Sequence, residues 1–272
     1  MLQTGKNDVL RITAFGIENL KSAPCIIYVH GFKGFKDWGF VPYAGDYFAK
    51  NGYFVITFNF SHNGVGENLL EFDEPDKFAK NTLSLEVSEL NEIINAYQDG
   101  FFGERSEQGI GIIGHSRGGA ISLFVGSERN EVKAVVAWSS IALLDRFTQR
   151  QKDEWIKNGF FEVVNSRTNE VIRLDTSLLE DIEKNKLSSL NLEQAVKNLS
   201  KPLLIAQGEQ DLTVTLDEAK MLHEWSDKST SETYFIPATG HTYGIKHPFE
   251  GSNSAFDGLL EKTKYFFKSN LN

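Results

Sequence analysis

Short apolar runs that alternate with segments of helical periodicity are the strongest constraint on the fold of this chain. Several of these runs are nearly continuous in apolar residues, as is typical of strands buried on both faces of a parallel sheet. The runs cover residues 25–30, 53–60, 109–115, 132–138, 202–208 and 232–237. Helical patterns are expected at 41–52, 83–97, from 116 onward, at 216–226 and at 254–269. This alternation predicts an α/β fold with a doubly wound, mostly parallel sheet.

One segment breaks the alternation between the fourth and fifth strand-like runs. About sixty residues separate the runs at 132–138 and 202–208, which is too many for one helix with short connections. We therefore expect residues 1–272 to form a single domain that carries an insertion at 146–198. Open α/β sheets bind ligands at the carboxyl edge of their strands, so we interpret the insertion as a lid over that edge. The alternative is an excursion that lies far from the site.

Local signals inside the insertion predict a hairpin followed by a helix. Residues 160–174 form two β-prone arms around a turn signal at 167–169. The following segment has a helical pattern, and Asp175 or Thr176 is the expected N-cap. Near the start of the chain, residues 8–18 predict a hairpin or an antiparallel edge strand.

A glycine-spaced serine lies between a strand-like run and a helix-like run. Residues 114–118 read GHSRG, which matches the G-x-S-x-G nucleophile elbow in its required context. The serine of such an elbow is forced into a strained conformation, and side chains two residues away on either side would collide with neighbouring elements. Ser116 is therefore the candidate nucleophile. A serine hydroxyl is a weak nucleophile at neutral pH, so it needs a base nearby.

The candidate base and acid follow the last two strand-like runs. His241 lies in a short glycine-bounded loop after the run at 232–237, and His247 is its competitor. Asp211 follows the run at 202–208 and is the candidate for orienting the base. Glu209 and Asp145 are the alternatives for that acid.

Two backbone N–H groups are the candidates for an oxyanion hole. One belongs to Arg117, the residue after the candidate nucleophile, at the start of the expected helix. The other belongs to Phe32, within the HGF tripeptide at 30–32 that follows the first strand-like run. Both groups lie at the carboxyl edge of the predicted sheet.

Aromatic side chains near the predicted site suggest a substrate class. The candidates for substrate binding are Phe35, Trp38, Trp155, Phe160 and Phe161. An aromatic-lined cleft would suit hydroxycinnamoyl or other aryl esters, whereas the alternative is that these rings pack the insertion onto the body. Three cations, Lys33, Lys36 and Arg117, are candidates for contact with an anionic substrate, although exposed cations are usually only solvated.

With these motifs the chain resembles the α/β-hydrolase superfamily. The resemblance rests on HGF (30–32), GHSRGG (114–119), GEQD (208–211) and GH (240–241), in the serine, acid, histidine order of that superfamily. The short insertion resembles that of dienelactone-hydrolase-like proteins, feruloyl (cinnamoyl) esterases and prolyl-oligopeptidase-type catalytic domains. The resemblance implies an eight-stranded, mostly parallel sheet and hydrolysis through an acyl-enzyme.

This chain departs from those relatives at two places. Dienelactone hydrolases carry a cysteine where this chain has Ser116, so their activity is not expected here. Many relatives carry an Asp-x-x-Gly-x-Gly pattern after the strand that ends near residue 60, whereas this chain has Asn59, Ser61 and His62. No propeller-like domain accompanies the hydrolase motifs, which weakens the oligopeptidase interpretation.

The motifs predict a serine hydrolase that cleaves carboxylic esters of small molecules, either aryl (hydroxycinnamoyl) or short-acyl esters, with no metal or organic cofactor. A peptidase or amidase with the same triad is the alternative, and a non-catalytic binding protein is a more remote one. The net charge of −9 argues against nucleic acid or an anionic membrane as a partner. No signal peptide or spanning segment is visible, and Cys25 is the only cysteine, so we expect a cytoplasmic protein. The sequence leaves the oligomeric state open.

Overall fold

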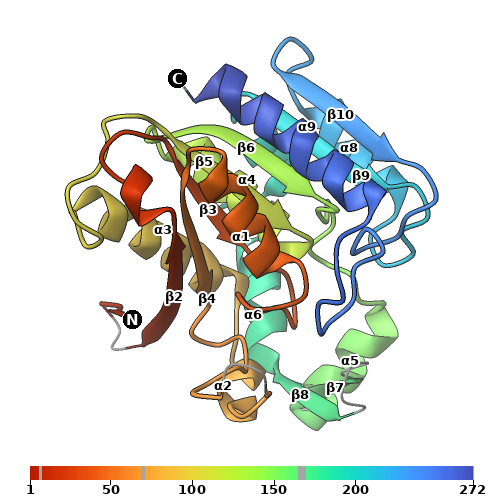
Figure 1. Cartoon of the computed structure of the whole chain (residues 1–272). Coiled ribbons are helices and arrows are strands. Elements are labelled where there is room, and N and C mark those ends of the chain that lie inside the picture. The colour runs from red at the N-terminus through yellow and green to blue at the C-terminus, as the bar shows by residue number, and fades with distance from the viewer. Residues whose placement is uncertain (6–7, 69–70, 165–169, 272) are drawn as a thin grey trace.

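The main sheet of the computed structural model confirms the predicted architecture. The structure describes residues 1–5, 8–68, 71–164 and 170–271. Within them, eight strands form one sheet in the order β1-β2-β4-β3-β5-β6-β9-β10 (Figure 1). Pairing is antiparallel only between β1 and β2 and between β2 and β4. The strands are β1 (Leu2–Gln3), β2 (Val9–Phe15), β3 (Cys25–Val29), β4 (Phe54–Asn59), β5 (Ile110–His115), β6 (Val132–Trp138), β9 (Leu203–Gly208) and β10 (Ser231–Ile236).

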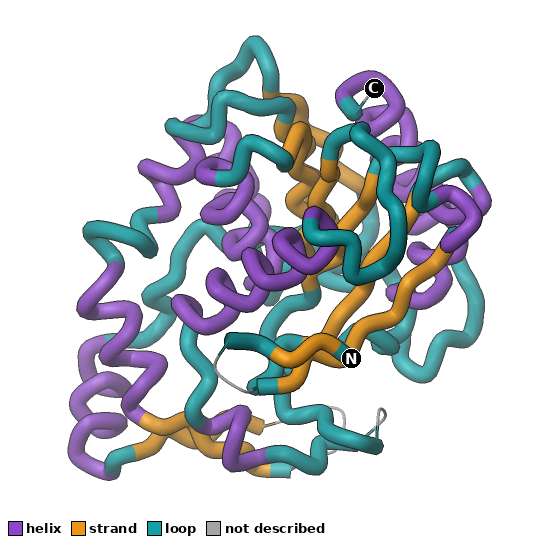
Figure 2. The backbone as a smooth tube through the Cα atoms, turned by 90° about the vertical axis from the view of Figure 1, so that its left-hand side faces the viewer, coloured by secondary structure: helices purple, strands orange, loops and turns teal. Residues whose placement is uncertain are grey.

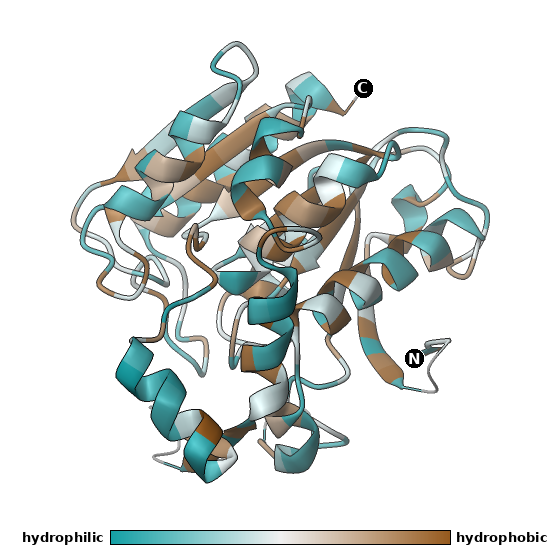
Figure 3. Ribbon diagram, turned by 180° about the vertical axis from the view of Figure 1, so that it is seen from behind, coloured by the Kyte–Doolittle hydropathy of each residue, from teal (hydrophilic) through white to brown (hydrophobic). Residues whose placement is uncertain are grey.

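Helices cover both faces of the sheet because its central strands are apolar on both sides. In β3, Ile26 and Tyr28 pack with helices α1 and α9, whereas Ile27 and Val29 pack with the helices of the opposite face. Figure 3 shows the hydrophobic strands enclosed by helices whose outer turns are hydrophilic. The helices of the two layers are α1 (Val41–Lys50), α3 (Leu83–Gln98), α4 (Arg117–Glu128), α8 (Leu216–Trp225) and α9 (Ser254–Asn270).

In the described part of the segment between β6 and β9 there are a separate two-stranded sheet and three helices. These are α5 (Gln149–Asn158), β7 (Phe160–Val164), β8 (Val171–Asp175), α6 (Thr176–Asn185) and α7 (Leu192–Lys197). Strands β7 and β8 pair antiparallel and lie apart from the main sheet (Figure 2). The predicted turn at 167–169 lies outside the described residues. Asp175 occupies the N-cap position of α6, but its side chain makes no capping hydrogen bond.

The elements of this segment contact different parts of the molecule. Helix α7 packs against α4 and α8 on the body, whereas α5 and α6 contact each other. The N-terminus of α3 is tied to α6, because Asp181 accepts hydrogen bonds from the backbone N–H (3.0 Å) and the hydroxyl (2.5 Å) of Ser84. A further short helix, α2 (Pro75–Ala79), follows β4 and contacts β8.

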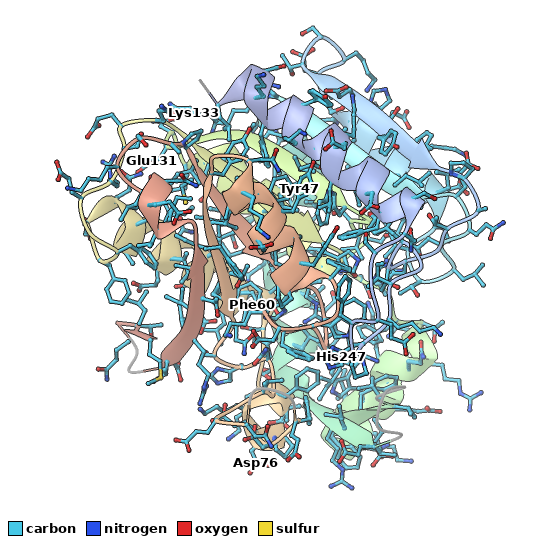
Figure 4. The ribbon with its side chains drawn as sticks, in the orientation of Figure 1. Tyr47, Phe60, Asp76, Glu131, Lys133 and His247 are labelled. Atoms are coloured by element: carbon cyan, nitrogen blue, oxygen red, sulfur yellow. The ribbon has the colours of Figure 1, made fainter. Side chains whose placement is uncertain are left out.

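The parallel strands give the molecule two unlike ends. Glu131 and Lys133, at the start of β6, lie at one end in Figure 4, and Asp76 and His247 lie toward the other. The β7–β8 hairpin and α2 lie at the latter end, beyond the carboxyl edge of the sheet (Figure 1). No helix within the described ranges is long and apolar enough to cross a membrane.

Candidate active site

Ser116 lies in a strained turn between β5 and α4. Its φ of 57° is in the left-handed region, where a non-glycine residue is held only by its surroundings. A Cβ at Gly114 would lie 2.3 Å from the carbonyl oxygen of Gly118, and one at Gly118 would lie 2.2 Å from that of Val29. These distances explain the glycines on both sides of the serine, because any side chain there would force β5, α4 or β3 to move.

Asp211 and His241 form a hydrogen-bonded pair at the ends of β9 and β10. The distance from His241 Nδ1 to Asp211 Oδ2 is 2.8 Å. Asp211 is 4% exposed, and its other oxygen accepts the backbone N–H groups of Thr213 (2.8 Å) and Val214 (2.9 Å). Burial raises the pKa of Asp211, but the hydrogen bonds from His241 and the two N–H groups outweigh it and lower the pKa below its usual value. The ionised carboxylate therefore requires a proton on Nδ1, which leaves Nε2 of a neutral His241 as the basic nitrogen.

The structure separates the other candidates from this pair. Glu209 is exposed, and Asp145 forms an ion pair with Lys152. The ring of His247 lies against Trp38, and its Nδ1 accepts the backbone N–H of Gly39 at 3.0 Å. The alternative acids Glu209 and Asp145 and the alternative base His247 therefore take no part in the Asp211–His241 pair.

Two side chains that sequence reasoning did not single out hold this pair in place. Gln207 donates from Nε2 to Asp211 Oδ2 (2.9 Å) and to the carbonyl of Val214 (2.8 Å). His115 is linked through Nε2 to the carbonyl of His241 at 2.9 Å. A polar residue inside the otherwise apolar run 202–208 was the available signal for Gln207. The link from His115 joins residues far apart in the chain, so no local pattern indicates it.

The two candidate oxyanion donors face the same space as the serine. Phe32 and Arg117 both line the cavity that contains Ser116 and His241. Within the described residues, neither backbone N–H donates a hydrogen bond, and the Ser116 hydroxyl makes none to His241. Catalytic hydrogen bonds are often long in free enzymes and shorten when substrate binds.

The cavity has a volume of about 500 Å³ and is lined by both polar and apolar side chains. Ser116 and His241 are among its polar lining residues. One group of apolar lining side chains, which we call the apolar wall, comes mostly from the segment between β6 and β9. The side chains of this apolar wall are Leu83, Ile141, Leu144, Phe147, Val163, Leu174, Leu178 and Ile182.

The aromatic side chains predicted to bind substrate divide into two groups. Phe35 and Trp38 line the cavity. Trp155, Phe160 and Phe161 are not among the described residues that line it, so their contact with a substrate stays a prediction. Trp155 is fully buried and stacks on Phe161 with ring centroids 5.2 Å apart, so it forms the small core of the insertion. The guanidinium of Arg173 covers the ring of Phe160 instead.

The cations near the cavity already have partners. Lys36 does not line the cavity, and its ammonium donates to Asp37 and Thr13. Lys33 lines the cavity and donates to the carbonyl of Val164 at 3.1 Å. Arg117 pairs with Glu86, and a further lining cation, Arg146, pairs with Glu218 at 2.7 Å. Of the three lining cations among the described residues, Arg117 and Arg146 are therefore neutralised by carboxylates, whereas Lys33 is held by a neutral carbonyl.

The described residues contain one group of side chains with the spacing of metal ligands. Asp8, His62 and Glu89 place ligand atoms within 4.8 Å of one another. His62 Nδ1 also contacts the hydroxyl of Ser61 (2.7 Å), which in turn donates to Glu89. None of these residues lines the cavity, so the group is separate from the candidate catalytic residues.

We expect the folded protein to lose stability as the pH falls from about 6.5 to 4. His30 is 3% exposed; its Nδ1 contacts the Gly31 carbonyl (2.9 Å) and its Nε2 accepts the Phe60 N–H (3.2 Å), which suits only the neutral ring. Burial lowers its pKa from 6.5 to about 4. The unfolded chain binds this proton first, so stability falls with pH by up to about 1.4 kcal/mol per unit.

Chemical denaturation at several pH values measures this slope, and His30→Gln should flatten it. His115, whose pKa burial lowers to about 3, should contribute to the same window. A variant with the slope of the wild type would show that His30 is not the group responsible.

The fold and the arrangement of this site define an α/β hydrolase. The chain belongs to the BAAT / acyl-CoA thioester hydrolase C-terminal family, whose model matches residues 103–255, just over half of the chain. This agrees with the resemblance found in the sequence motifs. No curated protein matches the chain in sequence.

Solved structures with the same fold cover almost the whole chain. Est1E from Butyrivibrio proteoclasticus, solved with ferulic acid bound, has a TM-score of 0.76 and 17% identity, over 99% of this chain and 98% of that one. The α/β hydrolase GrgF from Penicillium sp. sh18 has a TM-score of 0.76 and 14% identity, over 99% and 97%. A putative hydrolase from Agrobacterium vitis S4 has a TM-score of 0.73 and 17% identity, over 97% and 95%. At these identities the likeness concerns the fold.

Proposed function

We propose that the protein is a serine hydrolase that cleaves carboxylic esters through an acyl-enzyme. The observation that carries the proposal is the hydrogen-bonded Asp211–His241 pair, whose histidine lines the same cavity as the strained Ser116. The family match supports an enzyme that acts on esters. In this mechanism Ser116 is the nucleophile, His241 the base and Asp211 the group that fixes its tautomer.

The chemistry follows from the positions of these groups. His241 Nε2 takes the proton of Ser116 as Oγ bonds to the ester carbonyl carbon, and the carbonyl oxygen becomes an oxyanion between the N–H groups of Phe32 and Arg117. Collapse of this intermediate breaks the bond to the alcohol oxygen, which leaves with the proton from His241. Water then attacks the acyl-enzyme by the same route, releases the carboxylic acid and restores Ser116.

The apolar wall favours an uncharged, largely aliphatic acyl group. Seven of its eight side chains are aliphatic and the eighth is Phe147, while the other aromatic lining residues lie outside this wall. Those residues are Tyr28, Phe32, Phe35 and Trp38. Two of the three described lining cations, Arg117 and Arg146, are paired with carboxylates, which argues against an anionic acyl group beside them. Leu144, Val163 and Leu178 come from the segment at 146–198 or its edge, so we propose that this segment acts as a lid that also forms the acyl site. Aryl esters, one of the two alternatives that the sequence left open, have only Phe35 and Trp38 of the predicted aromatic set to contact.

Leu144→Trp should shorten the range of acyl chains that the enzyme accepts. Leu144 is half-buried and lines the cavity, so an indole there would occupy space that a longer chain needs. With p-nitrophenyl esters from acetate to decanoate, we expect acetate hydrolysis to change little and octanoate kcat/KM to fall by about tenfold or more. The matched control is Leu187→Trp, since Leu187 lies in the same segment but is 85% exposed. Equal losses on acetate and octanoate would contradict the assignment.

Thioester hydrolysis is the second candidate function, and the family match favours it. The same triad and oxyanion hole serve a thioester, because the attacked carbonyl and the intermediate are alike. A panel that holds the acyl group constant and varies the leaving group among alcohol, thiol and amine separates the two, and the amine arm tests the amidase alternative.

Covalent labelling tests the proposed function directly. A fluorophosphonate probe should add once to the folded wild-type protein, and peptide mapping should place the adduct on Ser116. No adduct on a well-folded protein would remove the proposal and leave the non-catalytic binding protein as the better interpretation.

A further inference from the structure

The side chain of Arg117 contacts the other candidate oxyanion residue. Its guanidinium carbon lies 4.2 Å from the centre of the Phe32 ring, within the range of a cation–π interaction. The same ring stacks on Phe78 of α2, with centroids 5.2 Å apart and planes 29° apart. One residue of the oxyanion hole therefore touches the side chain of the other, although the two lie 85 positions apart (117 − 32).

A buried acid holds the guanidinium in this position. Glu86 of α3, whose side chain is 4% exposed, pairs with Arg117 at 3.4 Å. Asn81 donates from Nδ2 to the same Glu86 oxygen at 2.6 Å. The Arg117 side chain is itself only 12% exposed. The positive charge of Arg117 is thus neutralised by Glu86 within the protein. An unpaired cation, by contrast, would be available to bind an anionic substrate.

The oxyanion loop needs such support because its own backbone is not in a relaxed conformation. Lys33, directly after Phe32, has a φ of 59°, and Gly34 donates to the Gly31 carbonyl in a tight turn. Oxyanion donors act only when they lie about 2.7–3.1 Å from the developing charge. A shift of a few tenths of an ångström in this loop would therefore weaken transition-state binding without closing the cavity to substrate.

We propose that the Arg117 side chain is a positioning residue that fixes the spacing of the two oxyanion N–H groups by clamping Phe32, and that Glu86 holds it there. This inference rests on the proposed function, since it assumes that those N–H groups bind an oxyanion. Arg117 acts through the Phe32 ring and makes no direct contribution to the reacting atoms with its guanidinium.

A double-mutant cycle between Arg117→Ala and Phe32→Leu tests the clamp. Each variant keeps its backbone N–H and removes one side of the contact. Removing one oxyanion donor outright costs about 10²–10³ in kcat, so a loosened donor should cost about 10-fold to 100-fold, with KM changed less than about twofold. The double variant should be no slower than the slower single variant, because both remove the same contact.

Binding of a transition-state analogue provides a measurement that would not change if Arg117 had only a structural role. A trifluoromethyl ketone forms a tetrahedral oxyanion on the serine, so its inhibition constant should rise in step with the loss of kcat/KM. Arg117→Lys should recover part of the loss, since an ammonium still contacts the ring and Glu86. Glu86→Gln should also lower kcat and raise the inhibition constant, but by smaller factors than Arg117→Ala.

The matched control is Arg105→Ala. The Arg105 guanidinium lies 5.8 Å from the Tyr97 ring and pairs with Glu107 at 3.7 Å, so it makes the same kind of contact away from the cavity. It should leave kcat and the inhibition constant unchanged.

Three results would contradict the positioning role of Arg117. They are a wild-type kcat in Arg117→Ala, a rise in KM alone in that variant, or additive losses of kcat in the double-mutant cycle. A rise in KM alone would make Arg117 a substrate-binding cation. Fluorophosphonate labelling separates these results from failure of the proposed function, because Ser116 should still be labelled in Arg117→Ala, though more slowly.

Discussion

Replacing Ser116 with alanine should reduce ester turnover by about 10⁴-fold or more while the protein stays folded. Alanine keeps the Cβ and the strained backbone but removes the oxygen that bonds to the substrate. The Asp211–His241 pair does not depend on the hydroxyl, because within the described residues Ser116 makes no hydrogen bond to His241. Hydrolysis of p-nitrophenyl butyrate and intact-mass labelling measure the two consequences, loss of turnover and loss of the covalent adduct.

The matched control for this variant is Ser127→Ala. Ser127 lies near the end of α4, the helix that follows Ser116. Its hydroxyl donates to the carbonyl of Phe124 at 2.7 Å, outside the cavity. It should keep both turnover and the adduct. Undiminished turnover in Ser116→Ala, with a wild-type unfolding profile, would show that another residue is the nucleophile.

Asp211→Asn should lower kcat by about 10⁴-fold with a small change in KM. Four N–H groups point at this carboxylate: those of Gln207, His241, Thr213 and Val214. An amide offers one acceptor oxygen where the carboxylate offers two, so one side must lose its partner. If His241 turns its unprotonated Nδ1 toward the new amide, its Nε2 carries the proton and cannot act as a base.

The comparison with Glu209→Gln decides which acid orients the histidine. Glu209 is two residues away and exposed, so its loss should leave kcat within about twofold. Loss of activity in Glu209→Gln with retention in Asp211→Asn would reverse the assignment. Circular dichroism of both variants checks that Asp211→Asn, which alters a buried hydrogen-bond network, still folds.

The parts of the fold that could be predicted depend on neighbouring residues in the chain. The apolar runs fall on β3, β4, β5, β6 and β9, because continuous apolar sequence is what a doubly covered strand requires. The sixth run falls on β10, a partly exposed strand at the edge of the sheet. The turn at Ser116 could also be predicted from the sequence. Gly114 and Gly118 are required there because a Cβ at either position would lie within 2.3 Å of a carbonyl oxygen.

The assignment of aromatic side chains shows where this reasoning stops. Trp155 and Trp38 are similar in sequence terms, because each is a large aromatic residue in a polar segment. In the structure Trp155 is fully buried against Phe161, whereas Trp38 borders the cavity. Only the packing of the insertion decides which ring meets a ligand.

The sequence by itself determined the strand and helix succession, the turn at Ser116 and the placement of candidate acid and base after their strands. These are consequences of local hydrophobic period and local sterics, which are encoded within a few residues. The tertiary structure alone decided the pairing of Asp211 with His241 rather than His247, the aliphatic character of the cavity wall and the contact of Arg117 with Phe32 and Glu86. Each of these joins residues distant in the chain, and their partners are chosen by how strands and helices pack, not by what flanks them.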